Sequence, residues 1–169
     1  GNDEQKKQFL PKIASGEMIL TLAFTEASGG IEAQDVTVTA KPSGNNFIIN
    51  GTKLFVPDAH VADYLLCVTR TSDSSNKEQG ITVFLVDAKT DGIQIEVLKT
   101  MTGEKLCEVV FNNVTVPRKS MLGKLDQGWP IMQRVLVEAQ VAECAWMTGG
   151  ARWAMETSID YARNRIAFD

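Results

Sequence analysis

Apolar and polar residues alternate along most of residues 18–116, and short clusters of glycine, proline, asparagine and aspartate separate the alternating segments. These clusters favour turns. Because side chains of a strand point alternately to its two faces, a period of two predicts strands. The predicted strands are 18–24, 36–41, 46–56, 63–70, 80–87, 92–99 and 108–116. Many short strands at regular spacing predict an antiparallel barrel or sandwich.

Two connecting regions have patterns of their own. The polar run TSDSSNKEQG at 71–80 predicts a solvated hairpin loop between two of the strands. At the N-terminus, a helical pattern reaches Phe9 and Leu10 and is followed by Pro11. The segment LPKIASGE at 10–17 then predicts the end of this helix and a turn before the first strand.

The period changes after LGKLDQG at 122–128. Apolar residues then recur at helical spacing, at Met132, Val135, Leu136, Ala139, Ala142 and Trp146. Gly149 and Gly150 interrupt the pattern at a cost of about 1 kcal/mol each, and it resumes in ARWAMETSIDYARNR. We expect one long helix, with the two glycines as the place for any bend.

A helix of about 35 residues spans roughly 50 Å, more than one small barrel can cover. Its apolar side is therefore expected to pack on other helices, either from a missing part of the chain or from another subunit. The pattern runs up to the last residues, RIAFD. We therefore expect the sequence to be a piece of a larger protein.

Charge and composition exclude several function classes. The 169 residues are 44% hydrophobic and carry a net charge of −4. A mildly acidic chain has no field that would hold nucleic acid or an anionic membrane. No apolar stretch approaches the roughly 20 residues of a membrane span, and the polar opening GNDEQKKQFL is unlike a signal peptide.

Cysteine and histidine offer no metal chemistry. Cys67, Cys107 and Cys144 are odd in number and widely spaced, so they predict neither a disulfide framework nor a zinc site. His60 is the one histidine of the chain and has no partner for a ligand set. We expect His60 in a loop and Cys67 in the core. A reducing compartment, the cytoplasm, is the expected location.

Six segments carry a resemblance to a known family. They are DEQKKQFLPKIASGE, FTEASGG, IINGTKLFV, FNNVTVP, LGKLDQGW and YARNRIAFD, and their order and spacing resemble the acyl-CoA dehydrogenase family over essentially all 169 residues. The resemblance implies a mainly β fold with flanking α-structure. Residues 1–17 would end an N-terminal helical domain, 18–122 would form an antiparallel β-barrel that binds flavin and acyl-CoA, and 123–169 would begin a C-terminal helical bundle.

The resemblance also implies a reaction, the α,β-dehydrogenation of an acyl-CoA thioester. In the family a glutamate removes the α-proton while the β-hydride passes to N5 of FAD, which supplies the redox chemistry. The implied partners are the acyl-CoA substrate, an electron-transfer flavoprotein as acceptor, and further copies of the chain in a homodimer or homotetramer.

TEASGGIE at 25–32 would form one wall of the flavin site. Thr25 matches the threonine that bonds the isoalloxazine edge, and Leu22 and Phe24 match strand positions along the ring. Gly30 matches the glycine that lets backbone amides approach the pyrophosphate, an arrangement suited to anions. Ile31 takes the place of a serine near the pyrophosphate and the substrate. The alternative is a plain loop whose glycines serve a turn.

Phe55, Val56 and Pro57 match the family's aromatic-Ile-Thr/Ser element. Phe55 would cover one side of the ring, and Val56 keeps its N–H for the flavin. Pro57 has neither the usual hydroxyl nor an N–H, so one contact of the family is lost. The alternative is a strand that ends at a proline, with Phe55 in the core.

Arg165 and Phe168 match the family's R-x-x-F element, which reaches the FAD of a neighbouring subunit. A guanidinium suits the charge of a diphosphate. The alternative for Arg165 is a surface arginine in the last turn of a helix, where the helix dipole favours a positive charge.

No residue of the chain is predicted to be the catalytic base, which is expected beyond Asp169. In a minority of the family the base lies on the long helix at the position of Ala139, which cannot act as one. Glu138 is adjacent, but Arg134 four residues earlier predicts a solvated ion pair instead. For the whole protein three alternatives stay open: a non-catalytic subunit of a hetero-oligomer, an acyl-CoA oxidase, and a flavin-free structural barrel.

Overall fold

The computed structural model describes residues 1–166. The chain divides into two compact units, Gly1–Trp129 and Pro130–Asp169. The first contains a short helix and all the strands, and the second is helical. Each unit is described by itself.

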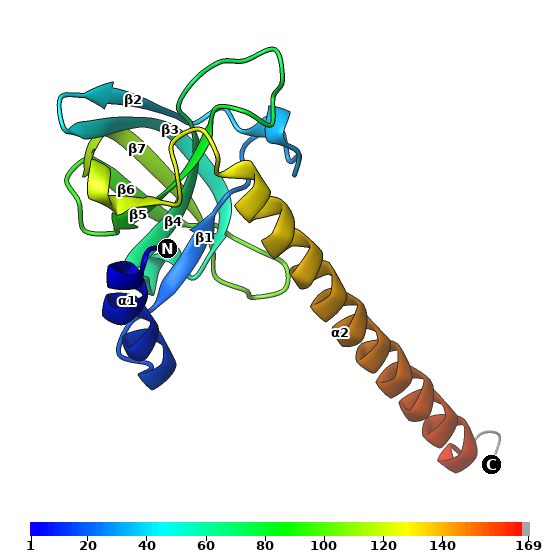
Figure 1. The fold of residues 1–169 in the computed structure, drawn as a ribbon. Helices are drawn as coiled ribbons and strands as arrows, with labels where there is room; N and C mark the ends of the chain where they lie inside the picture. The colour runs from blue at the N-terminus through cyan, green and yellow to red at the C-terminus, as the bar shows by residue number, and fades with distance from the viewer. Residues whose placement is uncertain (167–169) are drawn as a thin grey trace. The chain divides into compact units, whose positions relative to one another are not determined.

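The first unit is built on an eight-stranded sheet (Figure 1). Its strands are β1 (Leu20–Ala23), β2 (Thr39–Ser43), β3 (Asn46–Pro57), β4 (Tyr64–Arg70), β5 (Ile81–Asp87), β6 (Ile93–Val97), β7 (Leu106–Pro117) and β8 (Met121–Leu122). The order is β6-β7-β3-β2-β4-β5-β8, and β1 pairs with β4. Three 3-10 turns connect strands: η1 (Ala33–Asp35), η2 (Ala59–Val61) and η3 (Arg118–Ser120).

The predicted class, mainly β followed by a long helix, is confirmed, but the sheet is mixed and open. β1 runs parallel to β4, and Thr39 of β2 pairs in parallel with Arg70 of β4. The path of paired strands starts at β6 and stops at β8 without closing. Periodicity predicts that a segment is a strand but not its neighbour, so two parallel pairings between distant segments could not be predicted.

Alternation along the strands explains the core. On β3, Phe47 and Ile49 point inward and are 1% and 0% exposed. The Phe47 ring packs against the Phe84 ring of β5 in a tilted arrangement, with 5.1 Å between ring centroids, and Phe111 of β7 fills the same core. Large buried rings of this kind account for much of the driving force for folding. The loop at 71–80 joins the antiparallel strands β4 and β5, as predicted.

Helix α1 (Asp3–Ser15) continues through Pro11 and ends within the predicted segment 10–17, so the turn is shorter than predicted. Pro11 lies on the exposed side of α1, and a proline removes only one backbone donor. The true end is set by Gly16, which has a left-handed φ of 77° and donates its N–H to the Ile13 carbonyl. Glycine takes this conformation without strain.

The start of α1 is fixed by a capping box. The Asn2 side chain accepts the Gln5 N–H at 2.8 Å, and the Gln5 side chain accepts the Asn2 N–H at 2.9 Å. We expect Asn2→Ala to lower the free energy of unfolding by about 1 kcal/mol, because an N-terminal donor loses its acceptor. Urea denaturation measures the change. Asn2→Asp, which keeps an acceptor, should match the wild type, and equal losses in both variants would contradict this role.

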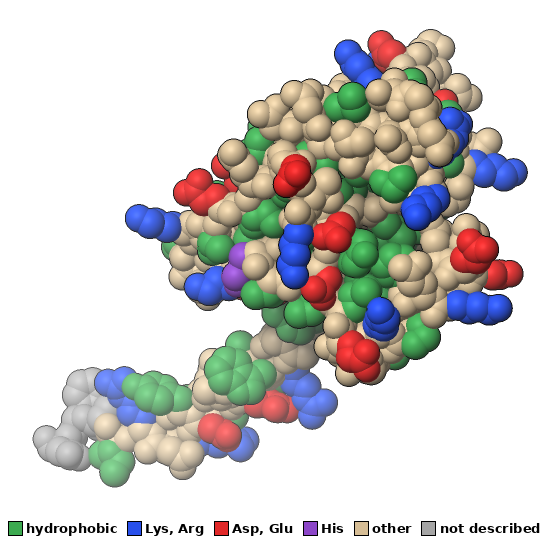
Figure 2. Space-filling model, turned by 90° about the vertical axis from the view of Figure 1, so that its left-hand side faces the viewer, with side chains coloured by type: hydrophobic (Ala, Val, Ile, Leu, Met, Phe, Trp, Pro, Cys, Tyr) green, Lys and Arg blue, Asp and Glu red, His purple; other side chains and the backbone are tan. Residues whose placement is uncertain are grey.

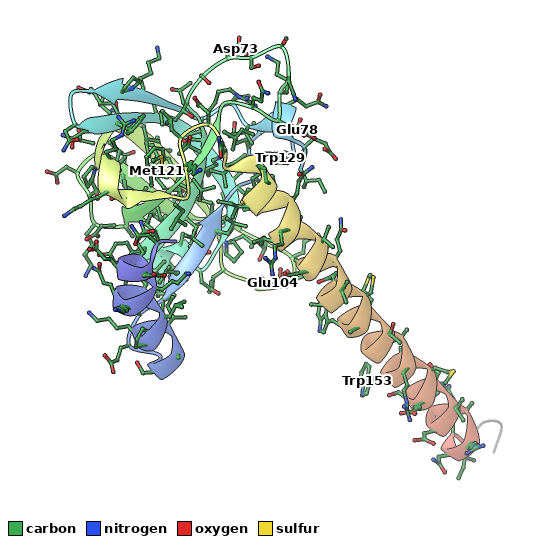
Figure 3. All side chains as sticks on the ribbon, viewed as in Figure 1. Asp73, Glu78, Glu104, Met121, Trp129 and Trp153 are labelled. Carbon is green, nitrogen blue, oxygen red and sulfur yellow. The ribbon has the colours of Figure 1, made fainter. Side chains whose placement is uncertain are left out.

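Helix α2 (Trp129–Asn164) is 36 residues long and runs without a break through Gly149 and Gly150. Many large apolar side chains of the second unit are exposed, including Val141, Trp146, Trp153 and Met155, and Trp153 is labelled in Figure 3. Arg134 and Glu138 form the predicted solvated ion pair, with 3.0 Å between Nε and Oε1. None of the helices in residues 1–166 combines the length and the apolar character needed to span a bilayer.

Candidate functional site

The end of β1 and the end of β3 lie side by side, which brings together two of the sequence segments predicted to bind flavin. The Thr21 hydroxyl donates to the Pro57 carbonyl at 2.6 Å, and the Leu54 N–H donates to the Thr25 carbonyl at 2.8 Å. Residues 22–25 and 55–57 therefore lie together in the first unit, and we call them the β1/β3 wall.

Phe55 is the most unusual residue of this wall. The register of β3 against β7 shifts between Lys53 and Val56, so that Leu54 and Phe55 together lie opposite Glu108 alone. This β-bulge turns the Phe55 side chain outward, where it is 52% exposed, and holds the residue at a left-handed φ of 55°. Bulges and strained non-glycine residues are concentrated at functional sites. The alternative that placed Phe55 in the core is wrong.

Other side chains of the wall are turned inward. Val56 is 1% exposed and belongs to the hydrophobic core, whereas Pro57 is exposed. Phe24 is 8% exposed and lies 6.3 Å from the Trp129 ring. Leu22 is half-buried beside Leu66 of β4.

Trp129 adds an unsatisfied polar atom next to this wall. Its indole is 2% exposed, and its Nε1 has no hydrogen-bond acceptor among residues 1–166. Trp129 is the first residue of α2 (Figure 3) and belongs to the first compact unit. A buried donor without an acceptor is rare in folded proteins and calls for an explanation.

The turn that follows the wall is closed by its own groups. The Gly29 N–H donates to the Glu26 carbonyl at 2.9 Å, and the Glu32 N–H donates to the Asp35 carboxylate at 3.0 Å. A Cβ on Gly30 would lie 2.0 Å from the Asp35 carboxylate, so the glycine leaves room for that group. Ile31 is 50% exposed. The close approach at Gly30 is therefore made by Asp35 within the chain.

Arg70 holds this turn and the 71–80 loop together. Its guanidinium donates to the carbonyls of Ala33 and Val36 on one side, and to those of Lys77 and Gln79 on the other. The loop is marked by Asp73 and Glu78 in Figure 3. The sequence did not predict this role of Arg70, because backbone carbonyls are present at every residue and leave no signature in the amino-acid sequence.

A buried ion pair behind the wall was also missed. Lys53 on β3 is 0% exposed and its Nζ lies 2.6 Å from Oε1 of Glu26, which is 5% exposed. Burial raises the pKa of Glu26, but the Lys53 charge and hydrogen bonds from Thr37 and Val38 outweigh burial and hold this pKa below its ordinary value. Glu26 is therefore ionised at neutral pH.

The environment of Lys53 leaves Glu26 as its counter-ion. Burial holds the pKa of Lys53 below its ordinary value, although the charge of Glu26 and its hydrogen bond act to raise it. Burial raises the pKa of the Cys67 thiol to about 12, so this thiol is neutral at pH 7. The prediction that Cys67 lies in the core is confirmed.

The remaining sequence candidates lie elsewhere. Arg165, in the second unit, donates to the hydroxyl of Tyr161 and lies 5.3 Å from its ring. Phe168 lies outside the described residues. His60 sits in η2, with Nδ1 3.8 Å from the buried Cys107 thiol. Within residues 1–166 no group of three or more His, Cys, Asp or Glu side chains could hold a metal ion.

The β1/β3 wall offers suitable contacts for a flat aromatic ring. The turn is less suited to a diphosphate. An exposed phenyl ring at Phe55 offers a stacking surface, and the Trp129 N–H lacks an acceptor in residues 1–166. At the turn, the Asp35 carboxylate lies against Gly30 and would repel an anion. The residues present thus fit the isoalloxazine end of FAD, whereas the turn holds its amides within the chain and places a negative charge where the diphosphate would lie.

Comparisons with known proteins agree with this fold. The model of the acyl-CoA dehydrogenase middle domain matches residues 21–114. The 3-(aryl)acrylate reductase of Clostridium sporogenes is 32% identical over 172 residues, covering 100% of this chain and 45% of the relative. The chain thus spans less than half the length of this relative.

Solved structures extend the likeness to nearly the whole chain. The acyl-CoA dehydrogenase of Geobacillus kaustophilus gives a TM-score of 0.93 at 26% identity, over 99% of this chain and 45% of that one. The FAD complex of PigA gives a TM-score of 0.91 at 27% identity, over 99% of this chain and 44% of that one. With the middle-domain match over more than half of its residues, the chain belongs to the acyl-CoA dehydrogenase family.

Proposed function

We propose that the whole protein is an FAD-dependent acyl-CoA dehydrogenase, which removes hydrogens from the α and β carbons of an acyl-CoA thioester. The observation that carries this proposal is Phe55, an exposed ring on a strained bulge directly beside the Thr25 segment. The likeness to the FAD complex of PigA supports the choice of cofactor. When bound, the flavin supplies the hydride acceptor.

Each residue of the β1/β3 wall has a proposed role. Phe55 covers one face of the ring and Pro57 continues the same edge, while Val56, whose side chain lies in the core, has only its backbone to offer. Thr25 offers a hydroxyl and backbone to the ring edge, and its carbonyl is already fixed by Leu54. The further proposed cofactor contacts are Leu22, Phe24, Gly30, Ile31, Arg165 and Phe168, with Ile31 also facing the substrate.

Proton abstraction needs a carboxylate within hydrogen-bond reach of the α-carbon. Glu138 is held by Arg134, and Ala139 has no acid group. We therefore propose that the base lies beyond Asp169. Residues 1–17, 18–122 and 123–169 are proposed as the end of one domain, a flavin-binding middle domain and the start of a helical domain.

The proposed partners follow from the same reaction. They are the acyl-CoA substrate, an electron-transfer flavoprotein as electron acceptor, and further copies of the chain. On the face shown in Figure 2, basic and acidic side chains are interspersed, which gives no support to a nucleic-acid partner. Three free cysteines in residues 1–166 support a reducing compartment, and we propose the cytoplasm.

The full-length protein tests the reaction. Purified protein is expected to bleach its flavin absorbance when an acyl-CoA is added without oxygen, and to reduce a dye acceptor on turnover. The likeness to a 3-(aryl)acrylate reductase favours a second candidate, reduction of a conjugated double bond. That function would show as oxidation of chemically reduced protein by an arylacrylate. Flavin that responds to neither substrate would contradict both.

The Asp35 carboxylate gives a prediction about the diphosphate. We expect Asp35→Asn in the full-length protein to tighten FAD binding by about two- to tenfold, because one like charge beside Gly30 is removed while an acceptor for the Glu32 N–H remains. Equilibrium dialysis at low salt measures the dissociation constant. Asp91→Asn, which removes an exposed charge before β6, is the matched control. Equal constants for Asp35→Asn and wild type would place the diphosphate elsewhere.

A further inference from the structure

The proposed chemistry gives no role to the most deeply buried charges of the first unit. Lys53 of β3 and Glu26, which follows β1, are buried in the first unit and are 0% and 5% exposed. A buried ion pair is weak evidence for stability, because desolvation of both charges offsets their attraction, and apolar residues of similar volume are often as stable. Hydrogen bonds made by buried charged groups do, however, depend on direction, so a satisfied network specifies one arrangement of the groups that it joins.

The pair joins three segments that are distant in sequence. Lys53 Nζ donates both to Glu26 and to the Phe24 carbonyl, the latter at 2.9 Å. The Glu26 carboxylate accepts the N–H groups of Thr37 and Val38 at 2.9 and 3.1 Å, and it also accepts the Thr37 hydroxyl. These contacts hold residues 24–26 against residues 37–38 and against the interior of β3.

Residues 24–26 have no sheet ladder to hold them, because β1 ends at Ala23. Their position is set by the ion pair and by the bond from the Leu54 N–H to the Thr25 carbonyl. Lys53 is also the last paired residue of β3 before the bulge that exposes Phe55. The same pair therefore lies behind both halves of the β1/β3 wall.

We propose that Glu26 and Lys53 are positioning residues of the cofactor site, which set the place of Phe24 and Thr25 relative to Phe55 without touching the ligand. This inference rests on the proposed function, since the ligand of the wall is taken to be FAD. Its content is separate: removing the pair changes how the flavin is held, even where the fold survives.

The test uses the full-length protein and the double variant Glu26→Gln/Lys53→Met, which removes both charges and keeps an acceptor for Thr37 and Val38. The matched control is Asp73→Asn/Lys77→Gln, which removes an exposed pair with 2.7 Å between its charged atoms. FAD affinity is measured by equilibrium dialysis, and the surroundings of bound flavin by its visible absorption bands and its fluorescence quenching.

The double variant is expected to bind FAD about tenfold more weakly and to shift the flavin absorption bands, whereas the control matches the wild type. A folded double variant with wild-type affinity and spectrum overturns the inference. If the double variant does not fold, Thr37→Val decides, because it loses only the hydroxyl that Glu26 accepts. We expect it to weaken FAD binding about threefold, and unchanged binding overturns the inference. Wild-type protein that binds no FAD would instead overturn the proposed function.

Discussion

Replacing Glu26 with glutamine, or Lys53 with methionine, is expected to lower the free energy of unfolding by about 3–5 kcal/mol. The two charged atoms are 2.6 Å apart in the wild type. Either change leaves one buried partner without its counter-ion. Urea denaturation of residues 1–169 measures the loss. The double variant should lose less than the sum of the two single variants, because no uncompensated charge remains. Additive losses would contradict a direct interaction.

The loss of stability at acidic pH should report on the same ion pair. The pKa of Glu26 in the folded chain lies below the ordinary value of 4.5, so its ionised form stabilises the fold. This contribution is fully present above pH 4.5 and is lost as the pH falls through the lowered pKa. Stability of the wild type should therefore decline below pH 4.5 more steeply than that of Glu26→Gln. If the free energies of unfolding of the wild type and of Glu26→Gln declined in parallel below this pH, the assignment would be contradicted.

Phe55→Gly is expected to weaken FAD binding by the full-length protein about tenfold or more while changing the free energy of unfolding by no more than about 1 kcal/mol. The ring is 52% exposed, so little buried area is lost. Glycine also adopts the left-handed φ of 55° without strain, which offsets its greater freedom in the unfolded chain. Equilibrium dialysis and urea denaturation together measure the two effects.

Phe84→Ala is the matched control for the loss of a ring. Phe84 is 0% exposed and packs against Phe47, so its removal should lower the free energy of unfolding by about 3–5 kcal/mol. Protein that remains folded should keep its FAD affinity. If Phe84→Ala weakened FAD binding as much as Phe55→Gly, general loosening of the sheet would explain both, and Phe55 would have no special role.

Sequence periodicity was sufficient for the strands and the long helix but not for their arrangement. Alternation located β3 and β7, and helical spacing located α2. It could not predict β8, which is only two residues long and is fixed by pairing with β5. Nor could it predict that α1 passes Pro11, because its end depends on the left-handed conformation of Gly16.

The candidate site was predictable to a similar extent. The resemblance to the family identified Phe55 as a candidate flavin contact, and the structure adds the bulge that exposes its side chain. Lys53 lies in the same inward phase of β3 as Phe47 and Ile49, so the strand pattern does predict an inward lysine. Its partner Glu26 follows β1 and is brought to it only by the fold. The contact of Asp35 with Gly30 likewise depends on a turn that no period describes.

Flavin content of the purified full-length protein tests the central claim, that the β1/β3 wall with Phe55 is one side of an FAD site. We expect yellow protein with about one FAD bound per chain, and a large loss of that FAD in Phe55→Gly with the fold retained. Colourless protein that takes up no FAD on dialysis, or a Phe55→Gly variant with wild-type FAD content and affinity, would contradict the claim.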